Sequence, residues 1–165
     1  MSCCALPGFA GPQDCPICGA RSKPVTRVTL EHLLRPERLG ELIDASFFFC
    51  ETPECDVVYY AEGGRRLFDK DDLTVRVGVK ERDDPVPVCY CFGHSERDIV
   101  EDVQTHGRST IYEAIKDNVR AGLCACEVTN PSGRCCLGNV QKAIQKARPE
   151  VPAVGLHRVR AGGPR

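Results

Sequence analysis

The sequence predicts an α+β fold, with a small β-rich subdomain followed by a subdomain of three helices. Before about residue 84, runs of β-branched and aromatic residues alternate with turn residues, which is typical of short strands. After that point, apolar residues recur every three or four positions behind capping residues, which is typical of helices. We therefore expect subdomains at residues 12–84 and 85–148, followed by a flexible basic tail at 149–165.

The first subdomain is expected to contain most of the strands. The stretch FFFCETPECDVVYYAE (47–62) predicts two strands joined by a tight turn, because a Thr-Pro pair interrupts two aromatic and β-branched arms. Further expected elements are a strand running into a helical turn at 25–34, a short helix at 37–43, and strands at 65–68 and 74–81. Prolines bias the stretch DDPVPVCYC (83–91) toward an extended chain.

Capping residues and apolar stripes predict the three helices of the second subdomain. Ser95 with Asp98 resembles a capping box at the start of the first helix. Thr110 with Glu113 predicts the start of the second helix, and a glycine follows each of these two helices. The third helix is expected to stop at Pro149 and carries an apolar stripe of Leu137, Val140, Ala143, Ile144 and Ala147.

Cysteine is the residue type that stands out in the composition, with 12 copies in 165 residues. The N-terminus lacks the basic flank and long apolar core of a secretory signal, so we expect a cytoplasmic protein. In a reducing compartment, this many thiols favours metal ligation over structural disulfides. No run of about 18 or more apolar residues predicts a membrane span, and the net charge of −1 gives no reason to expect nucleic-acid binding.

Four cysteines in two short turns predict a first metal site in the β-rich subdomain. Cys15 and Cys18 have C-x2-C spacing, and Cys50 and Cys55, after 31 intervening residues, have C-x4-C spacing. Two such turns deliver four sulfur atoms to a tetrahedral centre, each about 2.3 Å from Zn²⁺. We expect a structural zinc ion with no open coordination position, and mononuclear iron in the same shell is the alternative.

A second metal site is predicted from cysteines on both sides of the first two helices. Cys89 and Cys91 form a C-x-C pair before the first helix. After the second helix, the stretch CACEVTNPSGRCC (124–136) offers four more thiols, those of Cys124, Cys126, Cys135 and Cys136. Four thiolates hold a [2Fe–2S] cluster, and nearby helix N-termini favour its negative charge. No nucleophile–base pair is visible in the sequence, so we expect an electron carrier rather than an independent enzyme.

The stretches that carry these cysteines resemble known metal-binding proteins. PVCYCFGHSERDIVEDV (87–103) and CEVTNPSGRCCLGNV (126–140) are similar to the bacterioferritin-associated-ferredoxin (BFD) type of [2Fe–2S] domain. Together with VRVGVKERDDPVPVCYC (75–91) and the 47–62 stretch, they resemble more closely the N-terminal region of the CopZ copper chaperones. That region carries zinc and a [2Fe–2S] cluster, so the resemblance, which spans about residues 12–146, implies a BFD-like second subdomain.

The resemblance also implies which residues bind the cluster. The ligands implied by the family pattern are Cys89, Cys91, Cys126 and Cys136. Cys135 is the alternative to Cys136 as the fourth ligand, and Cys124 has no clear counterpart in the family. The chaperones continue into a heavy-metal-associated domain with a C-x2-C copper motif, which this chain lacks. Copper delivery by that route is therefore not expected.

The implied function is electron transfer linked to intracellular copper handling, for example reduction of Cu(II) to Cu(I) or copper chaperoning. The alternatives are a redox-sensing or scaffold module, and a structural protein with zinc in both sites. Cys3 and Cys4 are adjacent thiols that could bind Cu⁺ in place of the missing domain.

The expected partner is a redox protein, a copper chaperone or an exporter, without nucleic-acid binding or membrane insertion. Ionising eight thiols lowers the net charge from −1 to −9, and Zn²⁺ and an oxidised cluster each return two charges. The resulting charge of −5 favours a basic partner surface.

Overall fold

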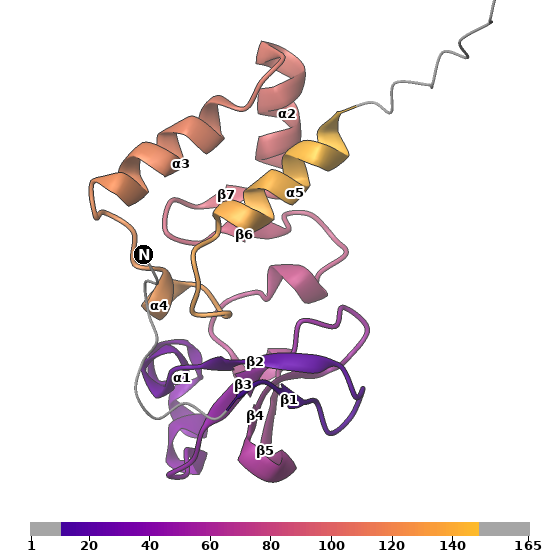
Figure 1. The fold of residues 1–165 in the computed structure, drawn as a ribbon, viewed down its shortest axis with the longest axis vertical. Helices are drawn as coiled ribbons and strands as arrows, with labels where there is room; N and C mark the ends of the chain where they lie inside the picture. Colours follow the sequence, from indigo (N-terminus) through magenta and orange to yellow (C-terminus); the bar gives the residue numbers. More distant parts are fainter. Residues whose placement is uncertain (1–10, 149–165) are drawn as a thin grey trace, which may run out of the picture.

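The computed structural model of the chain describes residues 11–148, and a sheet-containing half and a helical half lie end to end in it (Figure 1). The sheet is antiparallel in the order β1-β2-β3-β4-β5, so each strand pairs with its neighbour along the chain. Its strands are β1 (Gln13–Asp14), β2 (Arg21–Val25), β3 (Phe47–Phe49), β4 (Val57–Ala61) and β5 (Arg65–Asp69). The α+β prediction is confirmed, as are the strands expected within 47–62 and at 65–68.

Helical turns connect the strands of the first half. Thr26 caps helix α1 (Arg27–Leu33), which follows β2 directly as the 25–34 pattern predicts. A 3₁₀ turn, η1 (Pro36–Glu41), occupies the place of the helix expected at 37–43. Three shorter 3₁₀ turns follow, η2 (Glu62–Gly64), η3 (Lys70–Asp72) and η4 (Gly78–Lys80).

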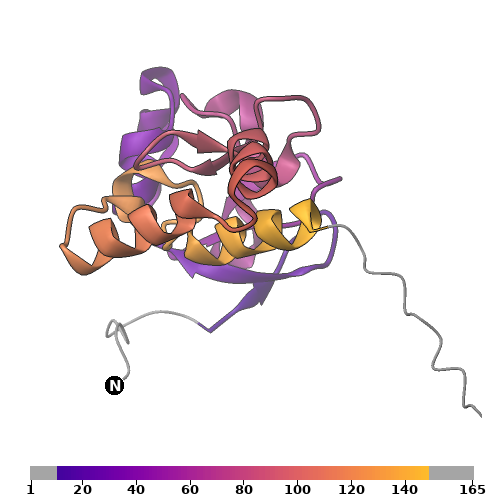
Figure 2. The ribbon, with the colours of Figure 1, turned by 90° about the horizontal axis from the view of Figure 1, so that it is seen from above.

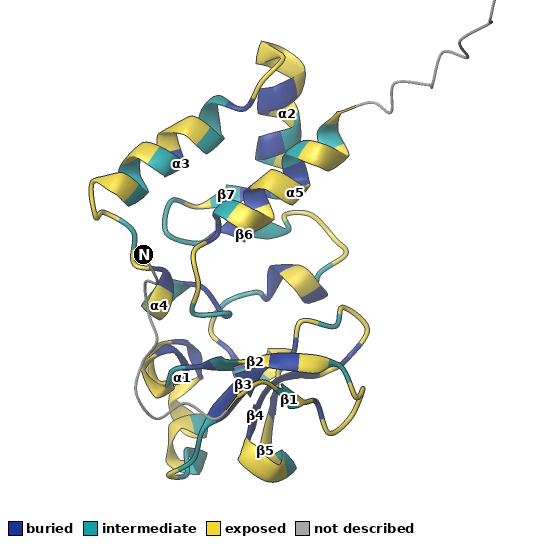
Figure 3. Ribbon diagram, viewed as in Figure 1, coloured by how far each residue is buried: buried dark blue, intermediate teal, exposed yellow. Residues whose placement is uncertain are grey.

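Side-chain alternation along β3 divides the aromatic residues between the two faces of the sheet. Phe47 and Phe49 lie in the main core with the apolar residues of α1. Phe48 lies on the opposite face, where its ring stacks on that of Tyr60 with centroids 5.5 Å apart. The central strands β3 and β4 are buried on both faces, whereas β5 is mostly exposed (Figure 3). The second face is the one that carries the buried cysteines Cys15, Cys50 and Cys55.

Residues 74–81 do not form the expected strand. In a strand, Val77 and Val79 would share one face, but Val77 is fully buried and Val79 is 38% exposed. The Tyr90 hydroxyl accepts from the Gly78 N–H at 2.8 Å and donates to Arg76 O at 2.9 Å. A side chain from the helical half therefore takes the backbone groups that a neighbouring strand would have paired, and the segment turns into η4.

The second half contains a two-stranded ribbon and the three expected helices, with one short helix that was not expected. The ribbon consists of β6 (Pro87–Cys89) and β7 (His94–Ser95). Helices α2, α3 and α5 gather around it (Figure 2). The helices are α2 (Glu96–His106), α3 (Thr110–Arg120), α4 (Cys126–Thr129) and α5 (Leu137–Ala147).

One of the two expected capping boxes is present. Ser95 and Asp98 exchange the two hydrogen bonds of a capping box at the start of α2. The box expected at Thr110 is wrong, because Ser109 caps α3. The Thr110 hydroxyl instead donates to the buried carboxylate of Asp102, which joins the end of α2 to the start of α3.

The two halves contact each other through the loop after α3. The Thr29 hydroxyl donates to Glu127 O at 2.7 Å, and the Tyr59 hydroxyl donates to Pro131 O at 2.6 Å. The subdomain boundary at residue 84 stays a prediction, and the tail at 149–165 lies outside the described residues together with Cys3 and Cys4. Within residues 11–148, no helix has the length and apolar character needed to cross a membrane.

Candidate metal centres

The first four predicted cysteines form a compact group on one face of the sheet. The sulfur atoms of Cys15, Cys18, Cys50 and Cys55 all lie within 4.8 Å of one another. The Cys15–Cys55 and Cys18–Cys50 sulfur distances are 3.9 and 3.6 Å. Tetrahedral zinc with Zn–S bonds of about 2.3 Å places its sulfur ligands about 3.8 Å apart. The donor set therefore fits a zinc ion.

Two tight turns present these sulfur atoms. In the first turn, the Gly19 N–H donates to Cys15 O at 2.8 Å, and Gly19 has a φ of 71°, which favours glycine. In the second turn, the Cys55 N–H donates to Thr52 O at 3.2 Å. The turns lie at the ends of the β1–β2 and β3–β4 hairpins, so a bound ion would tie the two hairpins together.

A buried lysine donates hydrogen bonds to the backbone of the second turn. Lys80 is 7% exposed, and its ammonium group donates to Thr52 O and Cys55 O, both at 2.8 Å. Burial raises the pKa of the Cys50 thiol, and the positive charge of Lys80 acts in the opposite direction. A four-thiolate zinc site carries a net charge of −2, so this cation also offsets part of the charge of the loaded site.

The thiols of this group differ in how readily they ionise. A hydrogen bond with the Thr52 hydroxyl, 3.3 Å from Cys18 Sγ, lowers the pKa of Cys18 to about 6. Burial raises the pKa of Cys55 to about 12. The lowered pKa of Cys18 favours its thiolate, which is the form that binds metal, whereas a metal ion has to displace the proton of Cys55.

The second set of predicted cysteines meets in two close pairs. Cys136 Sγ lies 3.2 Å from Cys89 Sγ, and Cys91 Sγ lies 3.4 Å from Cys126 Sγ. Within residues 11–148, the first group is the sole one with three or more ligand atoms all within 4.8 Å of one another. The sulfur atoms of the second set therefore lie farther apart than those of a tetrahedral mononuclear site. They come from segments that are distant in the sequence and meet as two pairs.

The thiols of the two pairs also affect one another's ionisation. Hydrogen bonds from Cys136, and after it from Cys91, lower the pKa of Cys126 to about 5. A hydrogen bond from Cys136 also lowers the pKa of Cys89 to about 7. The pKa of Cys136 is raised, because its proton is shared with both neighbours. The lowered pKa values of Cys126 and Cys89 favour the thiolate, which is the form that binds metal.

The remaining cysteines of the 124–136 stretch take different positions. Cys136 is 1% exposed and directly precedes α5, whereas Cys135 is exposed at the surface. Cys124 is half-buried. The sulfur that approaches Cys89 is thus that of Cys136.

Three polar residues that contact the cysteines were not predicted. Besides Thr52 and Lys80, the Thr129 hydroxyl lies 3.2 Å from Cys91 Sγ. The two threonines are two or three residues away from a predicted cysteine, and this spacing could have indicated them. Lys80 lies 25 residues from Cys55 and has no such signal.

The comparisons with known proteins agree on the family. Residues 12–74 match the CopZ zinc binding domain family. The copper chaperone CopZ of Archaeoglobus fulgidus is 37% identical over 129 residues, which cover 78% of this chain and 60% of the chaperone. The X-ray structure of the Archaeoglobus fulgidus CopZ N-terminal domain matches with a TM-score of 0.66 and 34% identity, over 79% of this chain and 96% of that one. The chain thus spans about 60% of the length of the chaperone, and it belongs to the family of the CopZ N-terminal domain.

Proposed function

We propose that this chain is a zinc- and [2Fe–2S]-binding electron-transfer protein of intracellular copper handling. In this proposal the four cysteines of the sheet half hold a structural zinc ion. The cluster is held by Cys89, Cys91, Cys126 and Cys136. The observation that carries the proposal is the meeting of these four sulfur atoms in two close pairs.

The arrangement of the second set favours a binuclear cluster over a second zinc ion. Zinc needs four sulfur atoms at the corners of one small tetrahedron, as in the first group. A [2Fe–2S] cluster takes four thiolates shared between two iron atoms and therefore accepts a wider set. The burial of Cys136 and the exposure of Cys135 support Cys136 as the fourth ligand.

The polar groups around the second set suit thiolate ligands. The Ala125 N–H donates to Cys91 Sγ at 3.3 Å, and the Thr129 hydroxyl lies 3.2 Å from the same sulfur atom. Cys136 occupies the N-cap position of α5, where the helix dipole favours negative charge. When bound, a [2Fe–2S] cluster transfers one electron at a time, and reduction of Cu(II) to Cu(I) requires one electron.

The link to copper comes from the similarity to CopZ of Archaeoglobus fulgidus, a copper chaperone. We propose that this chain supports copper handling by supplying Cu(I) to a chaperone or exporter. It would do so as a redox partner, with the electron supplied by the cluster.

Anaerobic purification tests the cluster. We expect a brown protein with two irons, two sulfides and one zinc per chain. The variant Cys136→Ser should lose the iron and keep the zinc, whereas the matched control Cys135→Ser should keep both. A colourless protein that holds two zinc ions would overturn the cluster and the electron-transfer role together.

The copper step needs its own measurement. The anaerobically reduced protein is mixed with Cu(II) in the presence of a Cu(I)-specific chelating dye, and one Cu(I) should form per cluster oxidised. If the cluster is present but no Cu(I) forms, the role in copper reduction is wrong, and the sensor or scaffold alternative takes its place.

A further inference from the structure

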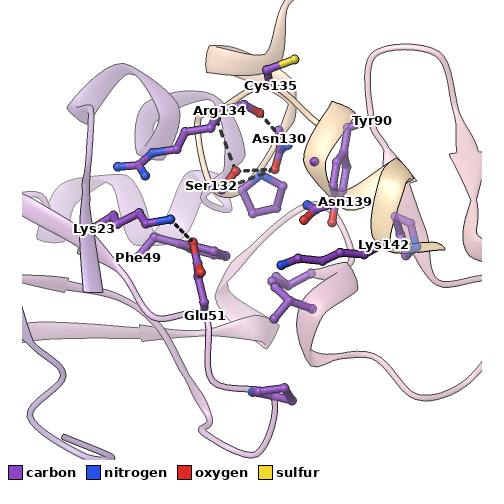
Figure 4. A pocket seen from close by; sticks show the side chains of 16 residues that line it. Lys23, Phe49, Glu51, Tyr90, Asn130, Ser132, Arg134, Cys135, Asn139 and Lys142 are labelled. Atoms are coloured by element: carbon purple, nitrogen blue, oxygen red, sulfur yellow. Dashed lines mark hydrogen bonds and ion pairs between the residues drawn. The ribbon is translucent and has the colours of Figure 1, made fainter. Parts of the chain in front are cut away.

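A cavity of about 440 Å³ lies between the two halves of the molecule (Figure 4). Its walls come from β2, the end of β3 and the turn that follows it, residues 77–90, the loop at 130–135 and the start of α5. Small-molecule pockets have volumes of about 300–1,000 Å³. None of the eight predicted ligand cysteines lines the cavity, but Cys135 does, and so does Tyr90, which lies between Cys89 and Cys91 in the sequence.

The charged side chains that line the cavity are mostly cationic. Lys23 and Lys142 extend toward the same space from opposite sides (Figure 4), and Arg134 also contributes to the wall. Glu51 is the one carboxylate among the described residues of this wall, and it lies 3.7 Å from Lys23. Lys142 forms no ion pair within residues 11–148. The wall therefore carries an excess of positive charge that a ligand could balance.

The floor of the cavity is apolar. The apolar surface open to a ligand comes from Val79, which is 38% exposed, from the half-buried ring of Tyr90, and from Pro53, Pro87 and Pro131. Gly138 and Asn139, in the first turn of α5, border the same space, and α5 has no side-chain cap at its N-terminus. An anionic group between the lysines and an apolar body on the floor would satisfy both parts of the lining.

We propose that this cavity binds a small organic anion, a carboxylate or phosphate carried on a flat apolar body. The excess of cations disfavours a metal ion or a cationic ligand in the same place. A different explanation for the lysines is that they only offset the negative charge of nearby thiolates. In that case the cavity would show no selectivity between an anion and a neutral molecule of the same shape.

Binding of benzoate to the purified full-length protein tests the site, with benzamide as the neutral molecule of matched shape. Ligand-observed NMR should show saturable benzoate binding with a Kd of roughly 1 mM, and benzamide should bind more weakly. Lys142→Met should weaken benzoate binding about two- to fivefold, as expected for one partly exposed ion pair. Lys146→Met is the control on the same helix, because Lys146 pairs with Glu96 outside the cavity, and it should leave benzoate binding unchanged.

Two results would overturn the proposal. One is equal binding of benzoate and benzamide. The other is equal binding of benzoate by the Lys142→Met and Lys146→Met variants.

A second consequence rests on the proposed function. Tyr90 and Cys135, which line the cavity, are chain neighbours of the proposed cluster ligands Cys89, Cys91 and Cys136, so the negative charge of bound benzoate should lower the cluster's midpoint potential. An unchanged potential at saturating benzoate would reject this consequence. Protein that binds benzoate but holds no cluster would uphold the cavity and remove only the proposed function. Protein that holds a cluster but does not bind benzoate would uphold the proposed function and overturn the cavity proposal.

Discussion

Replacing the buried lysine of the zinc-binding half should loosen the turn that carries Cys50 and Cys55. Lys80→Met keeps most of the side-chain volume but removes the ammonium group that donates to Thr52 O and Cys55 O. Within residues 11–148, the other hydrogen bond to these two carbonyl oxygens comes from the Cys55 N–H, which donates to Thr52 O. The substitution therefore leaves a buried carbonyl without a partner.

The magnitude follows from the environment of the two bonds. A hydrogen bond to a charged group contributes about 1.5–3 kcal/mol, and a buried carbonyl left unsatisfied costs about 1–3 kcal/mol. The Cys55 bond is buried, whereas the Thr52 bond is partly open to water. Removing a buried charge also recovers part of its desolvation cost. We expect a net loss of about 2–3 kcal/mol in the free energy of unfolding.

Urea unfolding of the zinc-loaded protein measures this loss, and competition with a chelator measures zinc affinity, which should also fall. The control is Lys70→Met, because Lys70 is half-exposed and lies 4.0 Å from Glu81. Such a surface pair contributes less than about 0.5–1 kcal/mol. If both variants unfold at the same urea concentration and release zinc alike, Lys80 does not hold the turn.

Three further substitutions test other contacts. Burial opposes ionisation of Asp102, yet hydrogen bonds from the start of α3 lower its pKa to about 2. The ionised carboxylate therefore stabilises the fold above about pH 4, and this stabilisation is lost as the pH falls toward about 2. In Asp102→Asn, stability measured by circular dichroism should therefore depend less on pH in this range. An acid-unfolding profile identical to that of the unsubstituted protein would contradict this. Tyr90→Phe leaves two backbone groups of the 76–78 turn without partners and should cost about 1–3 kcal/mol in urea unfolding, whereas a loss below about 0.5 kcal/mol would mean that water replaces the hydroxyl. Gly78→Ala would place a Cβ 1.9 Å from Pro87 O and should cost about 3 kcal/mol, whereas Gly40→Ala, with no atom within 4 Å, should cost far less; equal thermal stability of the two variants would refute the clash.

Features with a complete local signal were predictable from the sequence. The aromatic alternation of 47–62 gives β3 and β4, and Ser95 with Asp98 gives the start of α2. The C-x2-C and C-x4-C spacings predicted the first cysteine group, because a tight turn brings both of its cysteines to one side. For the second group, spacing left four candidates in 124–136, and the family resemblance rather than spacing pointed to Cys126 and Cys136. The predicted resemblance to the CopZ N-terminal region is confirmed, and the BFD-like assignment of the helical half stays a prediction.

Features that depend on contacts between distant residues were not predictable. The alternation of residues 74–81 is as regular as that of a true strand, but the Tyr90 hydroxyl captures the backbone of this segment. Lys80 then reaches the turn at 52–55, and nothing near it in the sequence marks it as a partner of the cysteines. Helix α4 was missed because it is one turn long and begins at a predicted ligand, Cys126.

The placement of the second cysteine group depends on the sheet half as well as on the helices. Cys126 and Cys136 lie at the two ends of one loop, and two backbone carbonyls between them accept hydrogen bonds from Thr29 and Tyr59. Gly133, in the same loop, has a φ of 65°, and a Cβ there would lie 2.8 Å from Thr29 Oγ1. The loop therefore rests closely on α1 and the sheet. Because a zinc ion would tie together the hairpins of that sheet, it would also stabilise the surface on which the proposed cluster ligands meet.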